Sequence, residues 1–202
     1  MSIFGDNLFR AGQTGRDLRT YFQNMILPRV TSDVEKIKAV QFENETDEDL
    51  AAPIAKRHAV KPLALKLDQS KATVVPTTIV SRNEFGETFA GDGFMVRKII
   101  PFEGDAELFR RESSTTGSGG YPKGEVSGAK VTVGMDVPQA QTDAAERHIS
   151  GTIENIQQHA QWQSSEIAAF NQSLPGQVQA RVAARRAALS QADDLAKRLS
   201  GN

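Results

Sequence analysis

A heptad pattern in residues 142–202 constrains the fold more than any other feature of the sequence. From Ile149 to Phe170 the seam positions step alternately by four and three residues, which is the spacing of an apolar coiled-coil face. The same stepping resumes from Val178 to Leu199, after Leu174-Pro175. Residues 142–202 are therefore expected to form a long helical hairpin that breaks at Pro175. The alternative is one kinked rod whose seams are buried against other chains.

Two polar residues, Gln163 and Arg185, stand at seam positions. A polar seam residue lowers stability but sets the register and the choice of partner. The other interpretation is that both lie at the edge of the seam. We predict a protein-interaction surface that a partner completes, formed by Ile149, Ile153, Ile156, Trp162, Gln163, Ile167, Phe170, Val178, Val182, Arg185 and Leu189.

Residues 1–60 predict helices. Leu18, Phe22 and Ile26 share one helix face, and Pro28 is expected to end or kink that helix. Thr31 or Ser32 is expected to cap a second helix, and Thr46 a third.

Residues 61–141 predict a mostly antiparallel sheet of about five strands. Pro76 is expected to place its strand at a sheet edge or in a bulge, and Gly91-Asp92-Gly93 reads as a turn. Val131, Val133, Met135 and Val137 alternate as in a strand with one buried face. The chain is therefore expected to be α+β, with predicted strands at residues 63–67, 71–81, 94–101, 107–111 and 126–137.

The charge balance argues against nucleic acid as the main partner. The chain has 24 Lys and Arg against 25 Asp and Glu, spread evenly, so no segment has the basic field that holds a phosphate backbone. Two basic pairs remain as candidate nucleic-acid contacts, namely Arg110, Arg111, Arg185 and Arg186. Their other interpretation is solvated ion pairing, for the second pair with Glu166 or Asp193.

The sequence patterns of catalysis are missing. There is no cysteine, which excludes disulfides, thiolate nucleophiles and cysteine-based zinc sites and fits a reducing cytoplasm. His148 and His159 would lie about 16 Å apart on one helix, too far to share a metal, and are expected to be solvated. No serine-nucleophile, phosphate-loop or restriction-nuclease pattern occurs. We therefore expect no enzyme, cofactor or metal site. No signal peptide or apolar span is apparent either, so no membrane partner is expected.

Two segments resemble a family of uncharacterised prokaryotic proteins. In residues 101–125 the matching features are Pro101-Phe102, Gly104-Asp105, Leu108-Phe109 and Pro122-Lys-Gly-Glu125; in residues 155–189 they are Trp162, Phe170-Asn171, Leu174-Pro175 and Ala184-Arg185-Arg186. In that family the module lies N-terminal to an effector, such as a restriction-type nuclease or a TIR domain. This chain differs in its Ser/Gly-rich loop at residues 113–120 and in ending at Asn202, where relatives continue.

The resemblance implies a recognition or assembly module in prokaryotic conflict systems. The leading expectation is a non-catalytic, cytoplasmic assembly or regulatory subunit of an anti-phage defence complex, which binds and positions a separate effector protein. Its partner is expected to be that effector, a second copy of the chain, or both. The alternatives are a structural component of a phage or another large assembly, and a nucleic-acid-binding accessory protein.

Overall fold

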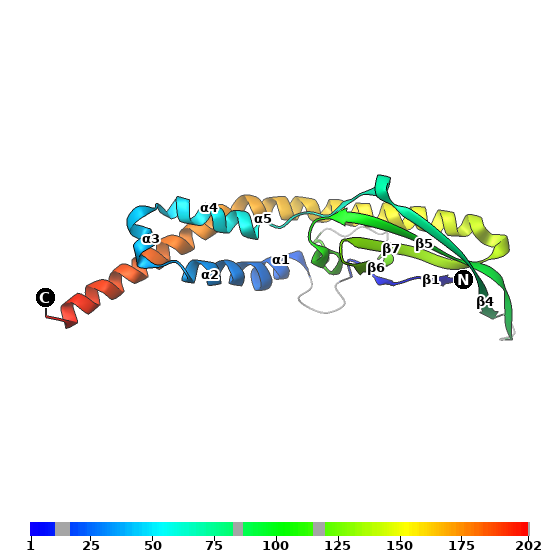
Figure 1. Cartoon of the computed structure of the whole chain (residues 1–202), viewed down its shortest axis with the longest axis horizontal. Helices are drawn as coiled ribbons and strands as arrows, with labels where there is room; N and C mark the ends of the chain where they lie inside the picture. Colours follow the sequence, from blue (N-terminus) through cyan, green and yellow to red (C-terminus); the bar gives the residue numbers. More distant parts are fainter. Residues whose placement is uncertain (11–16, 83–86, 115–119, 202) are drawn as a thin grey trace. The chain divides into compact units, whose positions relative to one another are not determined.

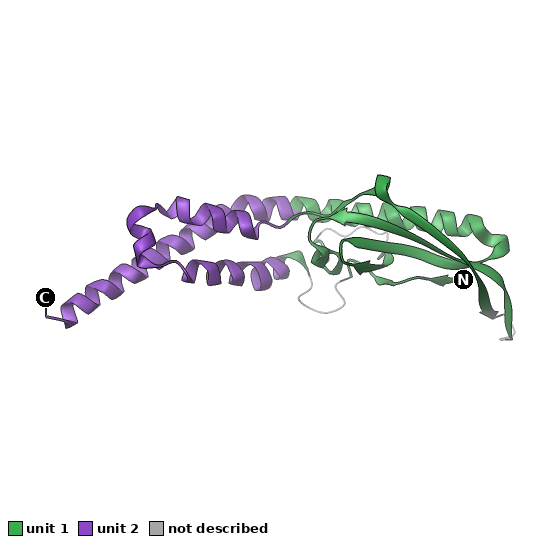
Figure 2. Cartoon of the chain, viewed as in Figure 1, with its two compact units in different colours: residues 1–18, 61–165 green, residues 19–60, 166–202 purple. Residues whose placement is uncertain are grey.

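A computed structural model describes residues 1–10, 17–82, 87–114 and 120–201. It has a seven-stranded antiparallel sheet, short N-terminal helices and one long C-terminal helix (Figure 1), which confirms the predicted α+β class. The residue contacts divide the chain into two compact units (Figure 2). Unit 1 contains residues 1–18 and 61–165, and unit 2 contains residues 19–60 and 166–202.

The sheet lies in unit 1 and is built around two long strands, β5 (Thr88–Glu103) and β7 (Lys130–Pro138), which pair with each other. Along the edge away from β7, β5 pairs with β4 (Lys71–Arg82) and with β3 (Ala64–Leu65). Along the edge away from β5, β7 pairs with β6 (Lys123–Ser127) and with β1 (Ser2–Ile3). The short strand β2 (Asp6–Asn7) pairs with β6. The unit also contains three short 3-10 turns, namely η2 (Leu67–Gln69), η3 (Ala106–Arg110) and η4 (Gln139–Gln141).

Three sequence predictions for the sheet are wrong. The strand predicted over residues 107–111 is instead the turn η3 and the residue after it, because the Asp105 side chain accepts a hydrogen bond from the Glu107 N–H and caps the turn. The strand predicted over residues 126–137 divides into β6 and β7, because Gly128 takes a left-handed φ of 57° and reverses the chain. Gly91-Asp92-Gly93 lies inside β5, opposite residues 77–79 of β4, and forms no turn.

Two other predictions for the sheet are confirmed. Within the described residues β4 pairs only with β5, so Pro76 does lie in an edge strand. The alternating apolar residues of β7 are buried, and Met135 and Val137 pack with Ala145 of the long helix.

The N-terminal helices are α1 (Leu18–Tyr21), the π-helical turn η1 (Phe22–Ile26), α2 (Leu27–Glu35), α3 (Ala39–Asn44) and α4 (Asp47–His58). Pro28 does not end the helical run, because η1 continues without a break into α2 and Pro28 lies within that run, at the second residue of α2. Thr31 and Ser32 lie inside α2 and cap nothing, and the Thr31 hydroxyl donates to the Leu27 carbonyl. Thr46 caps α4 as predicted, in a capping box with Asp49.

The predicted hairpin is wrong, because α5 (Thr142–Leu199) is a single helix of 58 residues with Pro175 inside it. It contributes residues 142–165 to unit 1 and residues 166–199 to unit 2. An interior proline costs a helix roughly 3 kcal/mol. Leu174 and Val178, on either side of Pro175, are almost fully buried within unit 2, and burying two such side chains offsets that cost.

Candidate protein-interaction surfaces

The predicted interaction seam is mostly the core of the chain itself. In unit 1 Ile149, Ile153 and Ile156 are buried. In unit 2 Phe170 stacks on Phe22 with ring centroids 4.1 Å apart, and Ile167, Val178 and Val182 are buried. These seven residues, proposed as an interface from sequence, are therefore covered by the chain's own sheet and N-terminal helices. Heptad spacing identifies a face that is buried, but it does not identify what covers the face.

Gln163 is a structural residue of unit 1. Its side-chain amide donates to the carbonyl of Leu108 at 2.9 Å and to that of Arg111 at 2.7 Å. Leu108 lies in η3, where its carbonyl also accepts from the Arg111 N–H at 3.1 Å, and Arg111 is the residue that follows η3. The side-chain oxygen is buried and has no hydrogen-bond partner among the described residues. The polar seam position thus serves an internal helix end rather than an outside partner.

The expectation of a solvated histidine is wrong for His159, whose exposed fraction is 4%. Its ring stacks on Phe9 at 4.9 Å and meets the half-buried Trp162 edge-on at 4.8 Å, and its Nε2 lies 3.2 Å from the Gly120 carbonyl. Burial lowers the pKa of His159, and the nearby Glu112 charge and the contact with Gly120 oppose that shift only partly. The site is an aromatic core cluster that favours a neutral imidazole.

Arg186 is an internal anchor of unit 2. Its guanidinium donates to the Asp47 carboxylate at 2.7 Å and to the carbonyls of Phe42 and Glu45 at 2.9 Å each, and it lies over the Phe42 ring. It therefore joins α5 to the end of α3 and the start of α4. The partner is Asp47, not Glu166 or Asp193, because the side chain leaves its own helix to reach three acceptors.

The other three candidate nucleic-acid contacts differ in exposure and in their partners. Arg185 is half-buried, and its Nε has no hydrogen-bond partner among the described residues. Arg111 is bound to Glu107, whereas the Arg110 side chain is 76% exposed. Arg110 and Arg111 belong to unit 1, and Arg185 and Arg186 belong to unit 2. Of these four cations, Arg111 and Arg186 are thus hydrogen-bonded within the fold.

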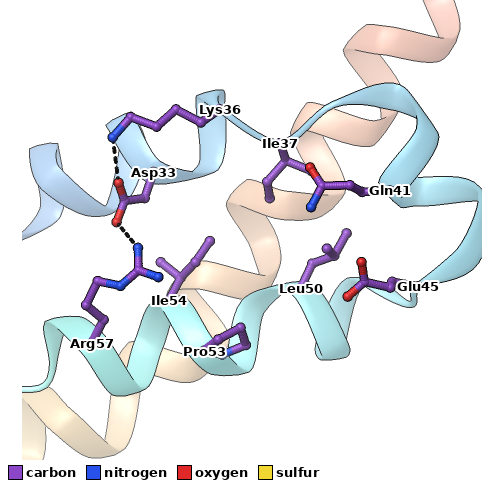
Figure 3. Close-up of a pocket in the computed structure, with 9 residues that line it drawn as sticks. All are labelled: Asp33, Lys36, Ile37, Gln41, Glu45, Leu50, Pro53, Ile54 and Arg57. Carbon is purple, nitrogen blue, oxygen red and sulfur yellow. Dashed lines mark hydrogen bonds and ion pairs between the residues drawn. The ribbon is translucent and has the colours of Figure 1, made fainter.

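A small pocket of about 270 Å³ lies in unit 2 between α2, α3 and α4 (Figure 3). Ile37, Leu50 and Ile54 supply its apolar surface. On its rim the Asp33 carboxylate meets Lys36 and Arg57, each at 2.8 Å (Figure 3), and His58 at 2.9 Å. Hydrogen bonds from Lys36, His58 and Arg57 hold the pKa of Asp33 well below its usual range. No sequence pattern indicated this cluster, because its members come from separate helices.

Among the described residues, two segments expose several apolar side chains. The first is the α5 tail, residues 187–201, where all residues but the half-buried Leu189 are exposed, including Leu195 at 49% and Leu199 at 80%. The second is the β4 edge, residues 71–82, where Val74 is 56% and Val80 66% exposed. The heptad pattern includes residues of the tail, but the pattern gives no reason to separate the exposed tail from the buried part of the seam.

Across the described ranges, no group of three or more His, Asp or Glu side chains is placed to hold a metal ion. None of the helices described combines the length and hydropathy that a membrane span requires. Comparisons with models of known protein families, with curated proteins and with solved structures found no match to this chain.

Proposed function

We propose that this chain is a non-catalytic assembly subunit, which binds a helical segment of a separate effector protein through the α5 tail. The observation that carries the proposal is the uncovered apolar stripe of this tail. Ala188, Ala192, Leu195 and Leu199 recur at helical spacing along one face, and all four are exposed.

The stripe is suited to a helix because of its length and its small residues. Ala188 and Leu199 are separated by about 16 Å along the axis at 1.5 Å per residue, or three helical turns. Alanine at two positions allows a partner backbone to approach closely, and the two leucines supply the apolar area. Helix ends without packing gain little stability of their own, so a partner that buries this stripe also orders it.

The charged residues of the tail leave the stripe apolar. Asp193 and Lys197 form an ion pair at 2.6 Å on the side of the helix away from the stripe, and Asp194 lies on that side as well. Arg198 is the one charged residue of the tail that borders the stripe, and flanking charges select partners and orientation in paired helices. The effector helix is therefore expected to carry an acidic residue opposite Arg198, beside its own apolar stripe.

The proposed setting is a prokaryotic anti-phage defence complex in the cytoplasm. The resemblance of residues 101–125 and 155–189 to a module found beside nuclease and TIR effectors supports this setting, and a chain without cysteine fits a reducing compartment. In this setting the effector is a separate protein that the tail positions.

The proposal is tested by co-expressing the tagged chain with the proteins whose genes lie beside its own gene, and by measuring which of them the tagged chain captures. Wild type is expected to retain one of them, and Leu195→Asp to lose at least nine-tenths of it, because the charge enters the buried stripe. Ser190→Asp, on the opposite side of the same exposed helix, is the matched control and should retain it. Both variants should melt like wild type. Capture of no neighbour, or equal capture by the two variants, would contradict the proposal.

A further inference from the structure

The β4 strand is long, and within residues 72–81 Pro76 is the one residue of a kind that blocks pairing with another chain. It has 12 residues, and within the described residues only β5 pairs with it. From residue 72 to residue 81 it carries no charged side chain, whereas exposed edge strands usually carry charges that block pairing with another chain. Its apolar side chains Val74, Val75 and Val80 are exposed. Such an edge presents a ready template for another strand.

Pro76 indicates which residues present their backbone groups to the open side. Proline has no N–H, and within a sheet it is tolerated where that position faces away from the neighbouring strand. With Pro76 oriented in this way, residues an even number of positions from it also direct their N–H and C=O groups outward. The outward set is therefore Ala72, Val74, Pro76, Thr78, Val80 and Arg82.

The outward residues of one copy can pair with the outward residues of a second copy when the two strands run antiparallel about one point. If two copies of β4 run antiparallel around a two-fold axis at Thr77, Ala72 faces Arg82, Val74 faces Val80 and Pro76 faces Thr78. Every outward residue then has a partner, and only the two prolines lack a donor. The same register brings together the two most exposed valines of the strand, on one face of the sheet, where each covers the other.

We propose that two copies of this chain associate through β4, with the free edges paired antiparallel about a two-fold axis at Thr77, so that the two sheets become one. A symmetric contact of this kind uses one surface twice and closes on itself, which accounts for an edge that lacks charges without leading to open-ended assembly. This contact is independent of the α5 tail.

The register is tested by cross-linking, since the chain has no cysteine of its own. At the axis Thr77 would face its own copy as a non-hydrogen-bonded pair with Cα atoms about 4.5 Å apart, within the span of a disulfide. Thr77→Cys is therefore expected to give a disulfide-linked dimer under mild oxidation. Thr73→Cys, also exposed, is the control, because its copies would lie roughly 27 Å apart at 3.4 Å per residue. Equal cross-linking of both variants, or none, would overturn the proposal.

The pairing of Val74 with Val80 is tested by charge, with the mass read by light scattering at micromolar concentration. Wild type is expected to have twice the mass of one chain. Val74→Lys with Val80→Lys should give monomers, because like charges meet across the axis. Val74→Glu with Val80→Lys should stay dimeric, because each glutamate then faces a lysine. A monomeric wild type, or the same mass for both double variants, would refute the inference.

The α5 tail provides a separate check. Leu195→Asp should leave the dimer mass unchanged while it abolishes capture of the effector. A Leu195→Asp variant that becomes monomeric would place self-association in the tail and exclude the β4 contact.

Discussion

Asn171 and Val60 are 111 residues apart in the sequence, yet one side-chain amide satisfies both backbone groups of the valine. The Val60 N–H donates to Asn171 Oδ1, and Asn171 Nδ2 donates to the Val60 carbonyl, each at 2.9 Å. Val60 is the second residue after the end of α4, and Asn171 lies on α5. The pair therefore ties the chain leaving α4 to the long helix of unit 2.

Removing this amide should destabilise the fold. Asn171→Ala is expected to lower the free energy of unfolding by about 2 kcal/mol, because both groups of a buried backbone lose their partner. Asn171→Asp should cost at least as much, since a carboxylate cannot donate to the Val60 carbonyl. The measurement is urea denaturation, with Gln172→Ala as control at the exposed next position. If Asn171→Ala and Gln172→Ala unfold alike, the two hydrogen bonds contribute nothing.

Two glycines should respond in opposite directions to the same change. A Cβ at Gly134 would overlap the carbonyl oxygen of Val96 on the neighbouring strand, so Gly134→Ala is expected to lose more than about 2 kcal/mol of stability. A Cβ at Gly176 meets nothing within 4 Å, so Gly176→Ala should gain about 0.5–1 kcal/mol from helix propensity. Thermal melts of both variants check the pair. A stabilised Gly134→Ala would show that β7 is not held against β5 as described.

Arg186 should not tolerate lysine. A lysine ammonium is a point charge and cannot reach the Asp47 carboxylate together with the carbonyls of Phe42 and Glu45. We expect Arg186→Lys to lose most of the roughly 2 kcal/mol that Arg186→Ala loses. Melting temperatures of the two variants give the comparison, and Arg198→Ala in the exposed tail is the neutral control. Wild-type stability in Arg186→Lys would mean that charge alone, not the planar fork, is required.

Acid should destabilise unit 1 through His159. Burial lowers the pKa of His159 below its ordinary value of 6.5, so the unfolded chain binds the proton first. The stability that the neutral ring contributes is present above pH 6.5 and is lost as the pH falls from there towards the folded-state pKa. Asp33, whose pKa is lowered from 3.8, loses its contribution only in stronger acid.

His159→Gln keeps a donor for the Gly120 carbonyl but cannot titrate. Its free energy of unfolding should therefore change less between pH 7 and pH 5 than that of wild type, in urea titrations at each pH. His148, whose pKa burial also lowers, remains in both proteins and leaves a residual slope. An unchanged slope in His159→Gln would assign the acid sensitivity to His148 or to other groups.

The sequence by itself determined the features that depend on neighbours along the chain. The capping box of Thr46 and Asp49, the alternating burial of β7 and the edge position of Pro76 follow from side-chain chemistry within a few residues. The α+β class and the long C-terminal helical segment follow from periodicity, which is equally local.

Only the tertiary structure decided what covers each face. Whether the helix breaks at Pro175 depends on a balance between a lost hydrogen bond and the burial of Leu174 and Val178, and the groups that bury them come from residues far away in sequence. The reason for a polar residue at position 163 is visible only in the folded chain, where the Gln163 amide donates to the carbonyls of Leu108 and Arg111. The heptad seam encodes that a face is apolar, but long-range packing divides it into a buried core up to Val182 and an exposed tail.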